Sequence, residues 1–78
     1  MKYPVKDGAE VRSTGNVLII ESSVSTVRLV ARYISSYTSV PAEDAVLVSM
    51  SNGNDHWFFA ESKDCYERVV GLLCRLEV

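Results

Sequence analysis

The side chains that could do chemistry gather at and after the stretch SNGNDHWFF, which covers residues 51–59. Asp55 and His56 are adjacent here, and Cys65 follows a few residues later. A thiol needs a neighbouring base or cation to become a nucleophile, so these groups would belong to a thiol enzyme. In the strand predicted below, however, Asp55 and His56 point to opposite faces and cannot easily act together. We therefore predict no catalytic residue and no enzymatic activity.

The same three residues and Cys74 are also the candidates for a metal site. Their spacing contains no Cys-x-x-Cys and no His-x-x-x-His pair, which are common ligand patterns for zinc. The four glycines are scattered and do not form the glycine-rich loop that binds phosphate. We predict no metal, no cofactor and no small-molecule substrate.

Both cysteines fall in one predicted helix. At about 100° per residue, positions 65 and 74 lie on opposite sides of that helix. A disulfide needs alpha carbons within about 7 Å of each other, so Cys65 and Cys74 should not bond within the chain. We expect two reduced, partly buried thiols, as is usual for a cytoplasmic protein.

Length and composition indicate one globular domain over residues 1–78. Hydrophobic residues make up 47% of the chain, charged residues 23%, and the net charge is −2. The longest uncharged apolar run, residues 17–20, is far shorter than the roughly 20 residues of a membrane helix. The start MKYPVKDGAEV has no apolar core of a secretory signal. We therefore predict a cytoplasmic protein with no membrane contact.

Two amphipathic helices and three to four strands are predicted. A short strand over 10–13 and a strand over 17–20 precede a helix from Val24 to Tyr37, in which apolar residues recur at helical spacing. Strands over 45–50 and 56–60 form a hairpin, and Ser62 caps the second helix. The order (β)βαββα predicts an α+β two-layer sandwich: an antiparallel sheet of three to four strands with both helices on one face. Many unrelated domains share this order, so it does not reveal function.

The hairpin decides which side chains face the helices. Asn52-Gly53 or Gly53-Asn54 can serve as a two-residue turn. Either turn places Trp57 and Phe59 under the helices, together with the even-numbered residues of the preceding strand. Leu47, His56 and Phe58 then face outward on the back of the sheet.

A pair of apolar residues from the 17–20 strand must join that outward face, either Val17 and Ile19 or Leu18 and Ile20. Unless the N-terminal segment folds across it, the back of the sheet exposes a contiguous apolar patch, and such patches usually mark an interface. We predict a small non-enzymatic protein-interaction module, either a homodimer or a stand-alone inhibitor or immunity-type protein that occludes a partner surface. The predicted interface residues are Leu47, His56, Phe58, Leu18 and Ile20.

The alternative hypothesis is a single-stranded nucleic-acid-binding protein, in which outward aromatic residues of the sheet stack on bases. Its predicted contacts are Arg28, Arg32, His56 and Phe58. Two arginines are not the basic stripe that phosphate binding usually requires, so nucleic acid is an unlikely partner. Acidic residues concentrate in the second half of the chain, which favours a basic protein partner instead.

Overall fold

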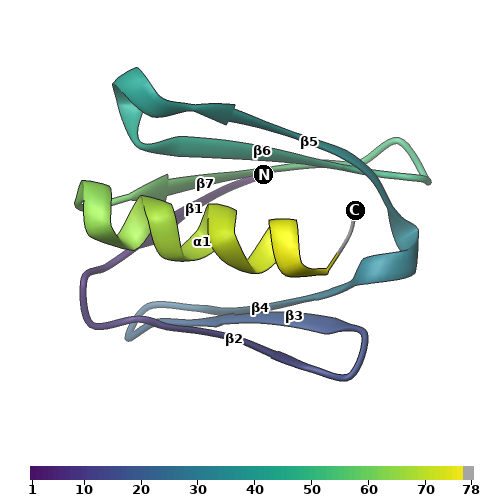
Figure 1. Ribbon diagram of the computed structural model, residues 1–78, viewed down its shortest axis with the longest axis horizontal. Helices are drawn as coiled ribbons and strands as arrows, with labels where there is room; N and C mark the ends of the chain where they lie inside the picture. The colour runs from purple at the N-terminus through teal and green to yellow at the C-terminus, as the bar shows by residue number, and fades with distance from the viewer. Residues whose placement is uncertain (77–78) are drawn as a thin grey trace.

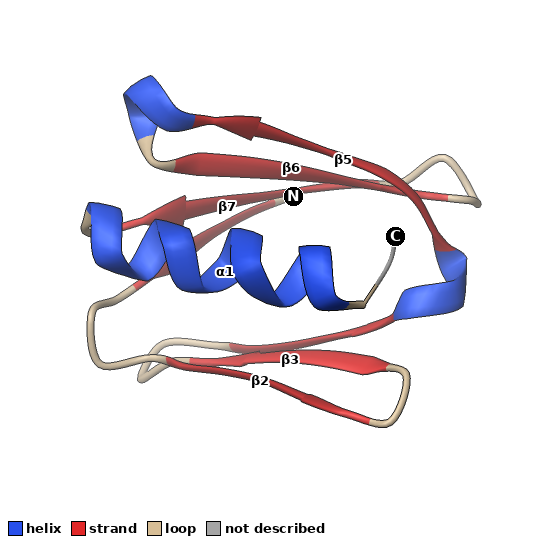
Figure 2. Ribbon diagram, viewed as in Figure 1, coloured by secondary structure: helices blue, strands red, loops and turns tan. Residues whose placement is uncertain are grey.

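The computed structural model describes residues 1–76. Within them the chain is α+β, with a mixed four-stranded sheet, a three-stranded antiparallel sheet and one α-helix (Figures 1 and 2). The elements are, in chain order, β1 (Lys2–Val5), β2 (Glu10–Thr14), β3 (Val17–Glu21), β4 (Thr26–Val30), the 3-10 turn η1 (Ala31–Tyr33), β5 (Ile34–Val40), the 3-10 turn η2 (Pro41–Glu43), β6 (Ala45–Met50), β7 (Asp55–Ala60) and α1 (Lys63–Arg75).

The two sheets lie on either side of the helix. The four-stranded sheet has the order β1-β7-β6-β5, in which β1 runs parallel to β7, and the smaller sheet has the order β2-β3-β4. In Figure 1 the helix lies between the two sheets, and its buried residues belong to the same core cluster as residues of both sheets. The prediction of two helices on one face of a single sheet is therefore wrong.

The segment predicted as the first helix forms β4, η1 and β5 instead. Val27 and Leu29 are buried while Thr26 and Arg28 are exposed, which is the alternation of a strand. Ser22 closes the hairpin between β3 and β4, and its hydroxyl accepts a hydrogen bond from the Ser25 amide at 3.3 Å. The many β-branched residues and serines of this segment, poor helix formers, fit the extended form.

The second predicted helix is confirmed as α1. The Cys65 amide donates a hydrogen bond to the Ser62 hydroxyl at 3.3 Å, which caps the first turn. Asp64 in the first turn and Arg75 in the last complement the helix dipole. Its buried side chains are Cys65, Tyr66, Val69, Leu72 and Leu73. Among the described residues, no helix is long and apolar enough to cross a membrane.

The β6–β7 hairpin uses a three-residue loop. The Met50 amide donates to the Asn54 carbonyl at 2.8 Å, and the Gly53 amide donates to the Met50 carbonyl at 3.0 Å. Gly53 has φ +90, the left-handed conformation that such a loop requires and that glycine adopts readily. Because the predicted loops had two residues, the extra residue reverses which face each β7 side chain occupies.

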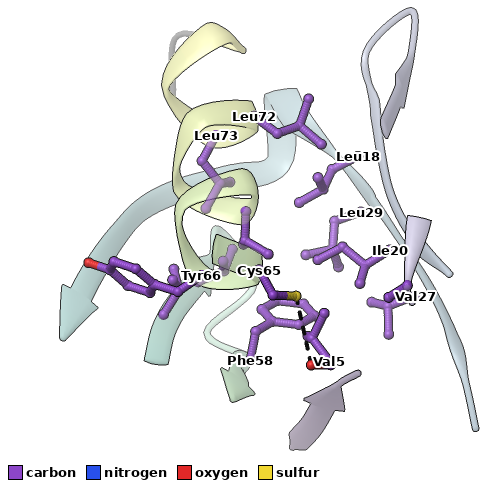
Figure 3. Packing of buried hydrophobic residues seen from close by; sticks show 14 of the residues in the cluster. Val5, Leu18, Ile20, Val27, Leu29, Phe58, Cys65, Tyr66, Leu72 and Leu73 are labelled. Carbon is purple, nitrogen blue, oxygen red and sulfur yellow. Dashed lines mark hydrogen bonds between the residues drawn. The ribbon is translucent and has the colours of Figure 1, made fainter. Parts of the chain in front are cut away.

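Phe58 therefore points into the core, opposite Val46, and is 1% exposed. Its ring stacks on Tyr3 of β1, with centroids 5.4 Å apart. Figure 3 shows Phe58 beneath Cys65 of the helix, while Leu18 and Ile20 of β3 approach the helix from the smaller sheet. The prediction that Trp57 and Phe59 belong to the core is wrong, because both face away from it.

Candidate functional site: an aromatic patch on the outer sheet face

Four large apolar side chains from three adjacent strands cluster on the outer face of the four-stranded sheet. In the sheet register Pro4 of β1 lies beside Phe59 of β7, and Trp57 lies beside Leu47 of β6. Neighbouring residues in register share a face, so these four lie on the side opposite Phe58. We call Pro4, Leu47, Trp57 and Phe59 the outer patch.

Two stacked aromatic rings form the centre of the outer patch. Trp57 and Phe59 are two positions apart in β7, and their ring centroids are 5.7 Å apart with an interplanar angle of 18°. Phe59 is 37% exposed, although a ring of its size usually seeks the interior. Stacking of two aromatic rings gains about 0.5–1.5 kcal/mol beyond the burial of their area.

Charges of both signs flank the outer patch. Lys2 lies beside Trp57 in the β1–β7 register, and Asp55 precedes Trp57 by two positions on the same face. The chain's N-terminal amine donates a hydrogen bond to the Asp55 carbonyl at 2.9 Å, which ties the start of the chain to β7. The patch is thus an apolar surface with Lys2, the N-terminal amine and the Asp55 carboxylate at its margin, suited to apolar contact with a mixed charged rim.

The predicted interface residues are only partly brought together. Leu47 lies on the outer face as predicted, and is half-buried. His56 and Phe58 lie on the inner side of β7, where the His56 ring packs 5.8 Å from Tyr3. Leu18 and Ile20 are buried against the helix. The prediction of an outward-facing position is wrong for His56, Phe58, Leu18 and Ile20. Trp57 and Phe59 occupy the outer face instead.

The residues proposed for nucleic-acid binding do not form one surface. Arg28 belongs to β4 and is paired in register with Ile19, on the outer face of the smaller sheet. Arg32 lies in η1 with its guanidinium 5.1 Å from the Tyr33 ring. Phe58 is buried, and the strand of Arg28 belongs to a different sheet from β7.

A shallow groove between α1 and β2 is a weaker candidate site. It is lined by Val11, Arg68, Gly71, Cys74 and Arg75. The Arg68 guanidinium is already engaged, because it donates to the Asp7 carbonyl at 3.0 Å and lies 3.7 Å from the Asp64 carboxylate. Its role is to tie the β1–β2 loop to the helix.

The acidic side chains of the second half are partly neutralised. Three of them form ion pairs: Glu61 with Lys6 at 3.4 Å, Asp44 with Lys63 at 3.8 Å, and Asp64 with Arg68 at 3.7 Å. Exposed pairs of this kind add little stability, but they reduce the field that a basic partner would sense. The acidic second half therefore offers weaker support for a basic partner than its composition implies.

The two thiols have different environments. Cys65 is buried, and its sulfur donates weak hydrogen bonds to the Val5 carbonyl at 3.8 Å and the Lys6 carbonyl at 3.7 Å. Burial raises the pKa of Cys65 above its ordinary value of 9.0, and the nearby Arg68 only partly opposes that rise. Cys74 is exposed. Within residues 1–76 no three His, Cys, Asp or Glu side chains converge on a metal position.

We expect a thiol reagent at neutral pH to label one thiol per native chain within the mixing time, and the second only after denaturant is added. Cys74 should supply the fast reaction, because Cys65 is a buried neutral thiol that reacts only when the chain opens. Quantitative labelling of wild type, Cys74→Ser and Cys65→Ala measures this. A fast reaction that survives in Cys74→Ser would revive the thiol-enzyme hypothesis.

The raised pKa of Cys65 also sets a pH dependence. The unfolded chain loses the Cys65 proton near pH 9.0, while the folded chain retains it to higher pH. The contribution of Cys65 to stability is therefore complete below pH 9.0 and is lost as pH rises through the folded pKa. The decline in stability above pH 9.0 should be shallower in Cys65→Ala than in wild type.

Comparisons with known proteins do not identify the chain. No protein-family model matches it, and no curated protein or solved structure was found to be similar to it. The functional reading therefore depends on the outer patch itself.

Proposed function

We propose that this chain is a small non-enzymatic protein-interaction module that covers a partner's surface with the outer patch, as an inhibitor or immunity-type protein does. The observation that carries the proposal is the stacked Trp57–Phe59 pair on the solvent side of the larger sheet. Rigid aromatic side chains are enriched in binding hot spots, because they bury a large area at little entropic cost. Leu47 and Pro4 extend this surface over the neighbouring strands.

The charges around the patch favour a protein partner over a nucleic acid. Single-stranded nucleic acid binds where stacking rings lie in a basic groove that follows the phosphates. The margin of the outer patch mixes Lys2 and the N-terminal amine with Asp55 and forms no basic groove, and Arg28 belongs to the other sheet. An apolar centre with a mixed polar rim is the usual anatomy of a protein interface. The proposal places the module in the cytoplasm, where both thiols would remain reduced.

Trp57 makes the proposal directly testable, because it is the only tryptophan of the chain and lies within the outer patch. Immobilised wild type, Phe59→Asp and Val24→Asp are used to capture proteins from the source cells. Val24 is an exposed apolar residue outside the outer patch, so it supplies the matched control. A partner held by wild type and by Val24→Asp, but lost by Phe59→Asp, supports the proposal.

Titration of that purified partner should shift Trp57 emission to the blue, because the ring leaves water. Phe59→Asp should weaken binding at least about thirtyfold, corresponding to a hot spot of about 2 kcal/mol. Capture unaffected by Phe59→Asp would refute the role of the outer patch. Quenching of Trp57 by a single-stranded oligonucleotide, with a steep loss at high salt, would replace the proposal with the nucleic-acid alternative.

A further inference from the structure

The free edge of β5 differs from the other strand edges of the described chain. The two sheets end at β1, β5, β2 and β4. Proteins protect edge strands with charged residues or proline, and β1, β2 and β4 each contain at least one of these. β5, with the sequence ISSYTSV, contains neither. In Figure 1 it forms the upper margin of the molecule.

The hydrogen-bonding pattern determines which backbone groups β5 presents at that edge. The Met50 amide donates to the Asn54 carbonyl, on the β7 side. Backbone groups alternate in direction along a strand, so Val48 and Val46 also direct theirs toward β7. The intervening residues Ser49, Leu47 and Ala45 direct theirs toward β5. The β5 residues paired with those intervening positions are Ser36, Thr38 and Val40. Tyr37 and Ser39 must therefore direct their amides and carbonyls away from the sheet. These groups can bond to a strand added at the edge.

We propose that two copies of this chain dimerise by pairing their β5 edges antiparallel, with the twofold axis passing between the two Thr38 residues. Tyr37 of each copy then faces Ser39 of the other, and these two pairs exchange their free backbone hydrogen bonds. The two Thr38 side chains lie directly opposite each other, an arrangement that stabilises antiparallel pairs. The irregularity between Ile34 and Ser36 limits the paired stretch to residues 36–40.

A second copy is the occupant that the residue types of β5 favour. In a twofold antiparallel pair the two strands have the same sequence, so a charge on one strand is repeated close by on the other. Like charges opposite each other destabilise such a pair. β5 has no charge and only small or β-branched residues on its outer face, which are Ser36, Thr38 and Val40. The strand is thus compatible with itself in this register.

The dimer would join two outer patches into one surface. Side chains opposite each other across strands share a face, and Thr38 lies beside Leu47 in the sheet register. The eight strands of the two copies then form one sheet, with both outer patches on the same side. The pairing does not depend on the proposed function, since it uses backbone groups of β5 and no residue of the outer patch.

The register is tested by disulfide formation in a Cys74→Ser background, which removes the exposed native thiol. Across the proposed pair, the alpha carbons at position 38 lie about 4.5 Å apart, within the range that a disulfide accepts. Thr38→Cys chains should therefore cross-link under mild oxidation at least about tenfold faster than Ser36→Cys chains, whose alpha carbons lie about 14 Å apart. A mixture of Ser36→Cys and Val40→Cys chains should form the mixed disulfide.

Solution mass provides the second readout. Wild type should be a dimer that dissociates on dilution, Thr38→Lys should be a folded monomer, and Thr26→Lys should remain a dimer. Thr26 is an exposed threonine on another edge strand, β4, so it controls for the added charge. Equal cross-linking of Thr38→Cys and Ser36→Cys, or a wild-type monomer at millimolar concentration, would overturn the dimer. If Phe59→Asp is also a dimer, the chains associate through the β5 edge and not through the outer patch.

Discussion

Replacing Phe58 with alanine is expected to lower the free energy of unfolding by about 3–5 kcal/mol. The ring is 1% exposed, stacks on Tyr3 and lies under the helix, so its removal leaves a cavity in the centre of the core. A chain of 78 residues has a total stability of only about 4–12 kcal/mol. The loss would therefore remove at least about a quarter of the total stability. Urea denaturation followed by circular dichroism, at one fixed protein concentration, measures it.

The adjacent residue provides the matched control. Phe59→Ala removes the same ring from the outer face, where it is 37% exposed and contacts Trp57, and should cost about 1 kcal/mol or less. Comparing the stability losses of Phe58→Ala and Phe59→Ala therefore distinguishes the observed register from the one that a two-residue turn would produce. A larger loss in Phe59→Ala than in Phe58→Ala would mean that β7 presents its other face to the helix.

Replacing Leu18 with alanine is expected to cost about 3 kcal/mol of stability. Leu18 is 0% exposed in the central strand of the smaller sheet, and in Figure 3 it lies opposite Leu72 of the helix. An interface residue would behave differently: its removal would weaken association and leave the folded monomer intact. Denaturant unfolding combined with solution mass distinguishes the two roles.

Val24→Ala tests the same hairpin at an exposed position. Val24 is 60% exposed in the turn between β3 and β4, so its truncation should change stability by no more than about 0.5 kcal/mol. If Leu18→Ala stays folded and stable but associates differently, Leu18 is an interface residue and the helix does not cover it.

Local signals in the sequence were sufficient to predict the C-terminal helix and the last hairpin. The Ser62 cap and the apolar stripe that follows it act within a few turns of one helix, so no distant residue is needed to interpret them. Asn52 and Gly53 likewise mark the β6–β7 turn. Their presence did not determine whether the loop has two or three residues, and that single residue decides the face of every β7 side chain.

Residues 24–37 show why the first predicted helix was wrong. Val27, Val30 and Ile34 fit a helical spacing, but Val27 and Leu29 also fit an alternating strand, and a short segment cannot decide between the two periods. Pairing decided it: β4 bonds to β3, and β5 bonds to β6. These strands acquire their stability from partners elsewhere in the chain, which outweighs a local preference.

The sequence by itself determined the α+β composition, the C-terminal helix, the hairpin and the presence of more large apolar residues than one helix-covered sheet face could hide. Only the tertiary structure decided that the surplus is divided between a second sheet and the outer patch. The physical reason is the range of the interactions. Caps and turns act between near neighbours, whereas the pairing of β1 with β7 and the burial of Phe58 join residues more than fifty positions apart.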